Sequence, residues 1–269
     1  MDWATALRND IRVRAAAWAT EQAIPHYTSL GTLPTVLFER ASDESRHGSF
    51  HSETWRAILD REHWRDRLTK PHSQSRALPP EKASSARELD SSNSSDALLM
   101  NCFCFPGAPV QILKGLGIPS DVSDPEFGIK ARLPLVDGSD DATEIDMRIG
   151  SHLFEAKLTE RDFTSASRTH IGRYRDLELC FNISALPVKG DDFAGYQLIR
   201  NVLAAAHHNA SLTVLLDQRR PDLLQEWWSV HSAIQNVDLR IRCGVRTWQE
   251  VAAASPPPLA QFLSAKYGL

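Results

Sequence analysis

The chain has 269 residues, of which 42% are hydrophobic and 24% are charged, as is ordinary for a globular protein with one large domain or a domain plus a helical appendage. No apolar run approaches the roughly 20 residues that cross a bilayer, and the N-terminus lacks the order of a signal peptide, so we expect a cytoplasmic protein without a membrane partner. The net charge of −4 differs from the basic surplus of most nucleic-acid binders, although local basic residues and bound metal ions would offset it.

The first seventy residues are predicted to form a helical subdomain. An apolar stripe with steps of three and four residues begins at Trp3 and predicts an amphipathic helix that extends to Trp18. A short strand is expected at 35–38, and Ser52 is interpreted as the N-cap of a further helix. Three histidines in this region lack carboxylate or cysteine partners at metal spacing and are interpreted as structural or solvent-facing: His47, His51 and His63.

Residues 71–95 differ in composition, with eight serines, a Pro-Pro pair and almost no apolar residues. Such a composition is typical of a linker or an ordered arm, and it predicts the domain boundary here. The remainder, 96–269, is expected to form the main domain. The four cysteines show neither a C-x-x-C pair nor zinc spacing, and free thiols are expected: Cys102, Cys104, Cys180 and Cys243.

The main domain begins with two predicted helices, over 96–105 and 110–116. A first core strand is expected within 125–136, where apolar residues alternate with Lys130 and Arg132. A turn at Asp137-Gly138 then leads toward the most informative segment of the chain.

Residues 143–160 contain two strand-like runs separated by a Gly-Ser turn. Because strand side chains repeat every two residues, Glu144 and Asp146 share one face of the first run, and Glu155 and Lys157 share one face of the second. If the runs pair as a hairpin, these two faces can belong to one face of a sheet. Three acids and a lysine would then lie close together.

Such crowding is costly unless a cation lies between the carboxylates, because neighbouring carboxylates raise each other's pKa or recruit a metal. Hard oxygen ligands suit Mg²⁺ or Mn²⁺ rather than zinc. A lysine two residues from a metal-binding glutamate can orient or deprotonate a water. The alternative is a surface hairpin that contains a chance E-x-K tripeptide.

The spacing of Asp146, Glu155 nine residues later and then Lys157 resembles the core of the PD-(D/E)XK nucleases, the restriction-endonuclease-like superfamily. Ile145 stands where the proline of the motif name would lie, a position that varies widely in such enzymes. The resemblance implies metal ligation by Asp146, Glu155 and the carbonyl of Ala156, with Lys157 beside the attacking water. It also implies an α/β fold in which helices flank a mixed central sheet.

Enzymes of this superfamily usually add an acid from upstream of the hairpin, for which Glu126 is the candidate and Asp124 the reserve. Glu144 is a further candidate metal ligand. Many also carry a glutamine on the helix after the hairpin, which points at the reaction centre. Gln197, within the helix predicted over 193–208, matches that place, and a buried polar cap is the alternative role for it.

The chain after Lys157 is polar and basic, with aromatic residues among the cations. Contact with a nucleic-acid strand and a plain solvated loop are both compatible with this segment, and its candidate phosphate-binding residues are Arg168, Arg173 and Arg175. Beyond it we expect a strand at 211–216, a helix at 222–234, a final strand at 237–245 and a C-terminal helix at 259–267.

The sequence therefore predicts a Mg²⁺- or Mn²⁺-dependent endonuclease that acts on nucleic acid, DNA above all, and the resemblance suggests restriction or phage defence. Two other functions remain open: a catalytically silent nucleic-acid or protein-binding module on the same fold, and a metal-dependent phosphoesterase for another substrate. A homodimer is also left open.

Overall fold

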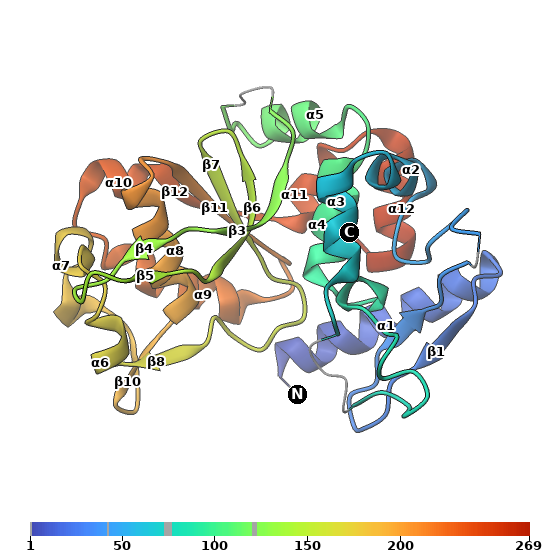
Figure 1. The fold of residues 1–269 in the computed structure, drawn as a ribbon, viewed down its shortest axis with the longest axis horizontal. Coiled ribbons are helices and arrows are strands. Elements are labelled where there is room, and N and C mark those ends of the chain that lie inside the picture. Colours follow the sequence, from blue (N-terminus) through green and yellow to red (C-terminus); the bar gives the residue numbers. More distant parts are fainter. Residues whose placement is uncertain (1, 42, 73–76, 120–122) are drawn as a thin grey trace. The chain divides into compact units, whose positions relative to one another are not determined.

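A computed structural model describes residues 2–41, 43–72, 77–119 and 123–269 (Figure 1). The chain divides into two compact units. Unit 1 comprises Met1–Ser120 and Trp248–Leu269, and unit 2 comprises Asp121–Thr247. This division differs from the predicted boundary at 71–95, because the C-terminal residues return to the unit formed by the first part of the chain.

Unit 1 is mainly helical. Its helices and strands are α1 (Trp3–Glu21), β1 (His26–Thr28), β2 (Val36–Phe38), α2 (Ser52–Leu59), α3 (Glu62–Arg65), α4 (Ser95–Cys104), α5 (Ala108–Gly115), α11 (Trp248–Ala253) and α12 (Pro257–Tyr267). Strands β1 and β2 pair antiparallel. In the described part of the chain no single helix is long and apolar enough to span a membrane, and α4 with α5 meets the length and composition criteria only as a pair bent by 103°.

The described part of the serine-rich segment, residues 71–72 and 77–95, packs into unit 1 as an ordered arm. Its Leu78 and Ala86 form a small buried cluster with Leu37 of β2. The Asp90 carboxylate lies 3.0 Å from Nε2 of the buried His47. Apolar anchors and polar contacts such as that of Asp90 with His47 thus hold a segment whose average composition is that of a linker.

Helix α12 also belongs to the core of unit 1, where it packs against α1. The Phe262 ring meets the Trp18 ring edge-on, with 5.5 Å between centroids. The fully buried Lys266 donates hydrogen bonds to the carbonyls of Gly48 (3.1 Å) and Ser49 (2.8 Å). Burial lowers the pKa of Lys266 well below its usual value.

Unit 2 is an α/β unit. Its strands are β3 (Glu126–Lys130), β4 (Leu133–Pro134), β5 (Asp140–Asp141), β6 (Glu144–Ile149), β7 (His152–Ala156), β8 (Ser165–Ser167), β9 (Val188–Lys189), β10 (Asp192–Ala194), β11 (Ser211–Leu216) and β12 (Cys243–Thr247). Its helices are α6 (Arg168–Ile171), α7 (Leu177–Cys180), α8 (Tyr196–His207), α9 (Pro221–Ser232) and α10 (Val237–Arg242).

The central sheet of unit 2 has five strands in the order β12-β11-β7-β6-β3 (Figure 1). Strands β12, β11 and β7 run parallel, whereas β6 is antiparallel to both β7 and β3. Helices α7 to α10 contribute apolar residues to the core cluster that includes Leu212, Val214 and Leu216 of β11. The predicted mixed sheet with flanking helices is confirmed, and it is consistent with a restriction-endonuclease-like fold.

One predicted strand was wrong over most of its length. Residues 237–242 form helix α10, and the strand β12 begins only at Cys243. Asn236 caps this helix, because its side chain accepts a hydrogen bond from the Leu239 N–H at 3.0 Å. Leu239 is buried but Ile241 is exposed, so their apparent alternation does not reflect a strand face.

Candidate active site

The centre of the sheet opens where β6 and β7 separate. Their antiparallel ladder ends at the pair Met147–Phe154, so the next facing residues are Asp146 and Glu155. Beyond this point β6 remains paired with β3 and β7 with β11. The half-buried Asp146 carboxylate spans the opening by accepting a hydrogen bond from the Ala156 N–H at 2.8 Å. The predicted hairpin thus brings the two acids to one face of the sheet.

The backbone of β7 presents the Ala156 carbonyl to this opening. The Lys157 N–H donates to Leu215 O of β11 at 2.8 Å, whereas the Ala156 N–H points to the other side, toward Asp146. The N–H and C=O of one strand residue face the same neighbour. The Ala156 carbonyl therefore faces β6, beside the Asp146 carboxylate.

Glu155 and Lys157 form a buried ion pair in this opening. The Nζ atom of Lys157 lies 2.9 Å from Oε1 of Glu155, and the two residues are 6% and 1% exposed, respectively. The other oxygen of Glu155 accepts a hydrogen bond from Nδ2 of the fully buried Asn201 at 2.6 Å. The Lys157 ammonium also lies 5.6 Å from the centre of the Phe163 ring.

Lys157 is held in its charged form. Burial acts to lower its pKa, but the nearby charges of Glu155, Glu160 and Asp146, together with the hydrogen bond to Glu155, raise that pKa above the usual lysine value. The Glu160 carboxylate is fixed close by, because it accepts the Leu158 N–H at 2.6 Å. The ammonium therefore neutralises part of the negative charge of the opening.

Helix α8 contacts this site through Asn201. Arg200 donates to the Asn201 side-chain oxygen at 3.0 and 3.2 Å, which turns the amide nitrogen toward Glu155. Gln197 is half-buried, and its backbone N–H donates to Phe163 O at 3.0 Å. Asn201 lies one helical turn after Gln197, so the two residues lie on the same side of α8.

The other candidate acids are exposed. Glu126 of β3 is exposed and forms a two-pronged ion pair with Arg148 of β6, with distances of 2.9 Å to both of its oxygens. Glu144 is exposed at the start of β6, and its carbonyl accepts from Arg200 at 2.8 Å. Asp124 is also exposed. Within the described ranges, no group of three or more His, Cys, Asp or Glu side chains is arranged to hold a metal ion.

A buried arginine holds the segment that follows Lys157. Arg220 is fully buried and donates to the carbonyls of Glu160 (2.7 Å) and Arg161 (3.0 Å), with a longer contact of 3.5 Å to Leu158 O. The Asp222 carboxylate orients the guanidinium at 2.8 and 2.9 Å. Sequence reasoning did not identify Arg220, because it lies about sixty residues from the segment that it binds.

The predicted basic residues lie on the surface of unit 2. Arg168 begins α6 and its guanidinium lies over the Phe193 ring at 4.6 Å. Arg173 lies 3.6 Å from the Asp137 carboxylate and Arg175 lies 3.3 Å from that of Asp176. All three side chains are exposed. The exposed ion pairs of Arg173 and Arg175 are weak, so a phosphate could replace the carboxylate in each of them.

If these three arginines contact phosphates, their joint replacement by alanine is expected to lower DNA affinity and to reduce the salt slope of binding by about 0.9 for each lost contact. The measurement is a titration with duplex DNA in EDTA at several salt concentrations. A matched control replaces three exposed cations of unit 1 with alanine: Arg56, Arg65 and Lys114. An unchanged slope in the unit 2 variant would show that its arginines are merely solvated.

The five-stranded mixed sheet with its flanking helices is that of an α/β protein and is consistent with a restriction-endonuclease-like fold. The chain belongs to the family described as Restriction Endonuclease associating with ARP, whose model matches residues 15–268. Comparisons with curated proteins and with solved structures gave no match.

Proposed function

We propose that this protein is a metal-dependent endonuclease of the PD-(D/E)XK type that hydrolyses phosphodiester bonds in DNA. The observation that carries the proposal is the convergence of Asp146, Glu155 and Lys157 where β6 and β7 separate. Membership in a restriction endonuclease family supports nucleic acid as the substrate. Restriction or phage defence is the role that fits this family, and a homodimeric state and a cytoplasmic location remain predictions.

The donors in the opening fit a small divalent cation. Asp146, Glu155 and the Ala156 carbonyl supply hard oxygens, and Mg²⁺ is commonly held by one or two carboxylates, with waters and substrate phosphates as its other ligands. A third carboxylate is therefore not required, and the exposed Glu126 and Glu144 are not needed for this minimal set. When bound, Mg²⁺ or Mn²⁺ supplies Lewis-acid stabilisation and a more acidic water.

The protein's own residues hold this site in position. Asn201 fixes one oxygen of Glu155 and leaves the other to Lys157. Asp146 is oriented by the Ala156 N–H, which also ties β6 to β7 across the opening. Lys157 presents a positive charge that can stabilise the negative charge developing at phosphorus. Gln197, half-buried one turn before Asn201, is proposed as a further polar group of the site.

The proposal is tested by incubating the purified protein with supercoiled plasmid, single-stranded DNA and RNA, each with Mg²⁺, Mn²⁺ or EDTA. We expect cleavage of DNA with either metal and none in EDTA. Binding to DNA without cleavage under any condition would instead indicate a silent binding module. If a small phosphate ester is hydrolysed while every nucleic acid stays intact, the protein is a phosphoesterase for another substrate.

Replacement of Asp146 by asparagine is expected to weaken Mn²⁺ binding while preserving the fold, because an amide oxygen can still accept the Ala156 N–H. Losing even an outer partner of a metal ligand costs about 10–100-fold in affinity, so we expect a loss of at least about tenfold here. Calorimetric titration with Mn²⁺ measures the affinity, and circular dichroism checks the fold.

Glu178→Gln is the matched control for this experiment, because it removes an exposed carboxylate elsewhere in unit 2. Its Mn²⁺ affinity should equal that of the wild type. Equal affinity for the Asp146 variant would remove Asp146 from the metal site.

A further inference from the structure

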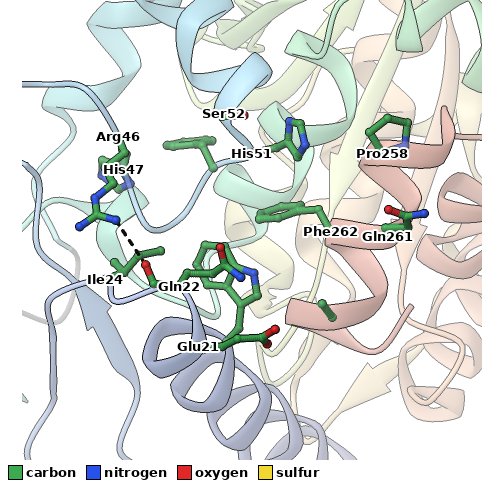
Figure 2. Close-up of a pocket in the computed structure, with 13 residues that line it drawn as sticks. Glu21, Gln22, Ile24, Arg46, His47, His51, Ser52, Pro258, Gln261 and Phe262 are labelled. Carbon is green, nitrogen blue, oxygen red and sulfur yellow. Dashed lines mark hydrogen bonds between the residues drawn. The ribbon is translucent and has the colours of Figure 1, made fainter.

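Unit 1 contains a cavity of about 510 Å³ that is separate from the residues of the nuclease site. Three segments surround it: the end of α1, residues 46–52, and α12 (Figure 2). Ligand sites in proteins typically have volumes of about 300–1,000 Å³ and combine an apolar lining with a few polar groups. This cavity has both properties.

Flat aromatic rings form much of its lining, through Trp18, Phe50 and Phe262. Phe50 is itself stacked on Trp55, with centroids 5.7 Å apart and an interplanar angle of 17°. Trp18 and Phe262 pack edge to face. Because each ring packs against another ring, the aromatic lining is held in place before a ligand arrives.

The 46–52 segment is fixed from two sides. Lys266 of α12 donates to the carbonyls of Gly48 and Ser49. At the other end, the Arg46 guanidinium donates to the carbonyl of Gln22 at 3.3 Å (Figure 2) and to that of Ala23 at 3.0 Å, just after the end of α1. The cavity is thus preformed, which lowers the entropy lost when a ligand binds.

A polar group with a defined hydrogen-bonding role also lines the cavity. His51, rather than the predicted Ser52, caps α2, because its Nδ1 accepts the Glu53 N–H at 3.2 Å. The neutral ring must then carry its proton on Nε2, so His51 is a donor at that atom. Burial lowers the pKa of His51, which keeps this tautomer neutral.

The rim supplies the remaining polar groups. The exposed side chains of Gln22 and Gln261 offer amides, Glu21 offers a carboxylate and Arg46 a guanidinium. Amides and carboxylates pair with the edges of bases, whereas an arginine suits a phosphate. Aromatic faces that stack bases, edge-reading polar groups and one cation are the combination by which proteins bind unpaired nucleotides.

We propose that this cavity binds a nucleobase with its attached phosphate, stacked on the aromatic lining and with the phosphate at Arg46. Two sources share this chemistry: a free mononucleotide and a base in single-stranded DNA. The proposal does not depend on cleavage, because its site lies in unit 1 and its residues include none of the proposed nuclease residues.

The experiment measures binding in EDTA by calorimetry and by thermal shift, so that cleavage does not contribute. The probes are the four deoxynucleoside monophosphates, a single-stranded oligonucleotide with all four bases, and deoxyribose 5-phosphate, which has no base. We expect at least one base-containing probe to bind and the base-free sugar phosphate not to bind. Binding of mononucleotides indicates a free nucleotide as ligand, and binding of the oligonucleotide alone indicates DNA.

Two exposed positions test the site: Gln261, and Arg46, whose replacement also removes its hydrogen bonds to the end of α1. Arg46→Ala and Gln261→Ala are each expected to weaken binding about tenfold, whereas their matched controls Arg65→Ala and Gln111→Ala, also exposed in unit 1, should not. Trp18→Phe keeps an aromatic ring in the core but reduces the stacking surface, and it should weaken binding as well. The proposal is overturned if no base-containing probe binds, or if binding is unchanged in all three cavity variants.

Discussion

The Lys157→Ala variant is expected to cleave DNA about 10²–10⁴-fold more slowly than the wild type, the usual contribution of a group that assists proton transfer. The ammonium lies 2.9 Å from Glu155 and, in the absence of metal, carries its proton. When the charges of Asp146 and Glu155 are neutralised by a bound cation, the pKa of Lys157 should fall, and its amine can take a proton from the attacking water. The measurement is single-turnover cleavage at saturating enzyme.

Lys157→Arg separates proton transfer from simple charge. A guanidinium keeps its proton near neutral pH, so this variant should remain as slow as the alanine variant. Lys189→Ala serves as the control, because Lys189 is exposed and pairs with Asp162 on the surface of unit 2. Wild-type cleavage by Lys157→Ala would refute the nuclease mechanism, and substantial cleavage by Lys157→Arg would assign the lysine a purely electrostatic role.

Replacement of Arg220 by methionine is expected to produce the largest loss of stability in unit 2. The variant removes a fully buried guanidinium and leaves the carbonyls of Glu160 and Arg161 without their donor. Each lost hydrogen bond to a charged group costs about 1.5–3 kcal/mol, so we expect a loss of about 3 kcal/mol or more in the free energy of unfolding. Urea denaturation measures this loss.

The same variant should also increase local unfolding of the segment 158–161. Faster hydrogen exchange of the amides in that segment would detect this unfolding. Arg175→Met is the matched control, because Arg175 is exposed and its change should alter stability by no more than about 0.5 kcal/mol. If the two methionine variants are equally stable, the contacts of Arg220 do not hold the segment after Lys157.

The hairpin and its polar face were predictable because a strand repeats every two residues. Once β6 and β7 turn at Gly150 and Ser151, the alternation alone places Asp146, Glu155 and Lys157 on one face. Because these three residues are close in the sequence, the local pairing of β6 with β7 decides that they share a face. The fold class was implied by the resemblance of this hairpin to the restriction-endonuclease-like superfamily, and its prediction is confirmed.

Elements whose local sequence signals are ambiguous were predicted less accurately than the hairpin. The alternation of Leu239 and Ile241 favoured a strand, yet the cap at Asn236 and the packing of Leu239 produce helix α10. The polar composition of 71–95 left a linker and an ordered arm open, and the packing of Leu78 and Ala86 in unit 1 is that of an ordered arm. In both cases a few tertiary contacts outweigh the average composition.

The sequence by itself thus determined the spacing of the two carboxylates and the lysine, because that spacing needs only a two-residue period and a tight turn. Only the tertiary structure decided which helical side chain reaches Glu155, that Arg220 clamps the chain after Lys157, and that α12 returns to α1 to enclose a cavity. These contacts join residues 46 to more than 200 positions apart. No local period specifies such pairs, because they depend on how all the elements pack together.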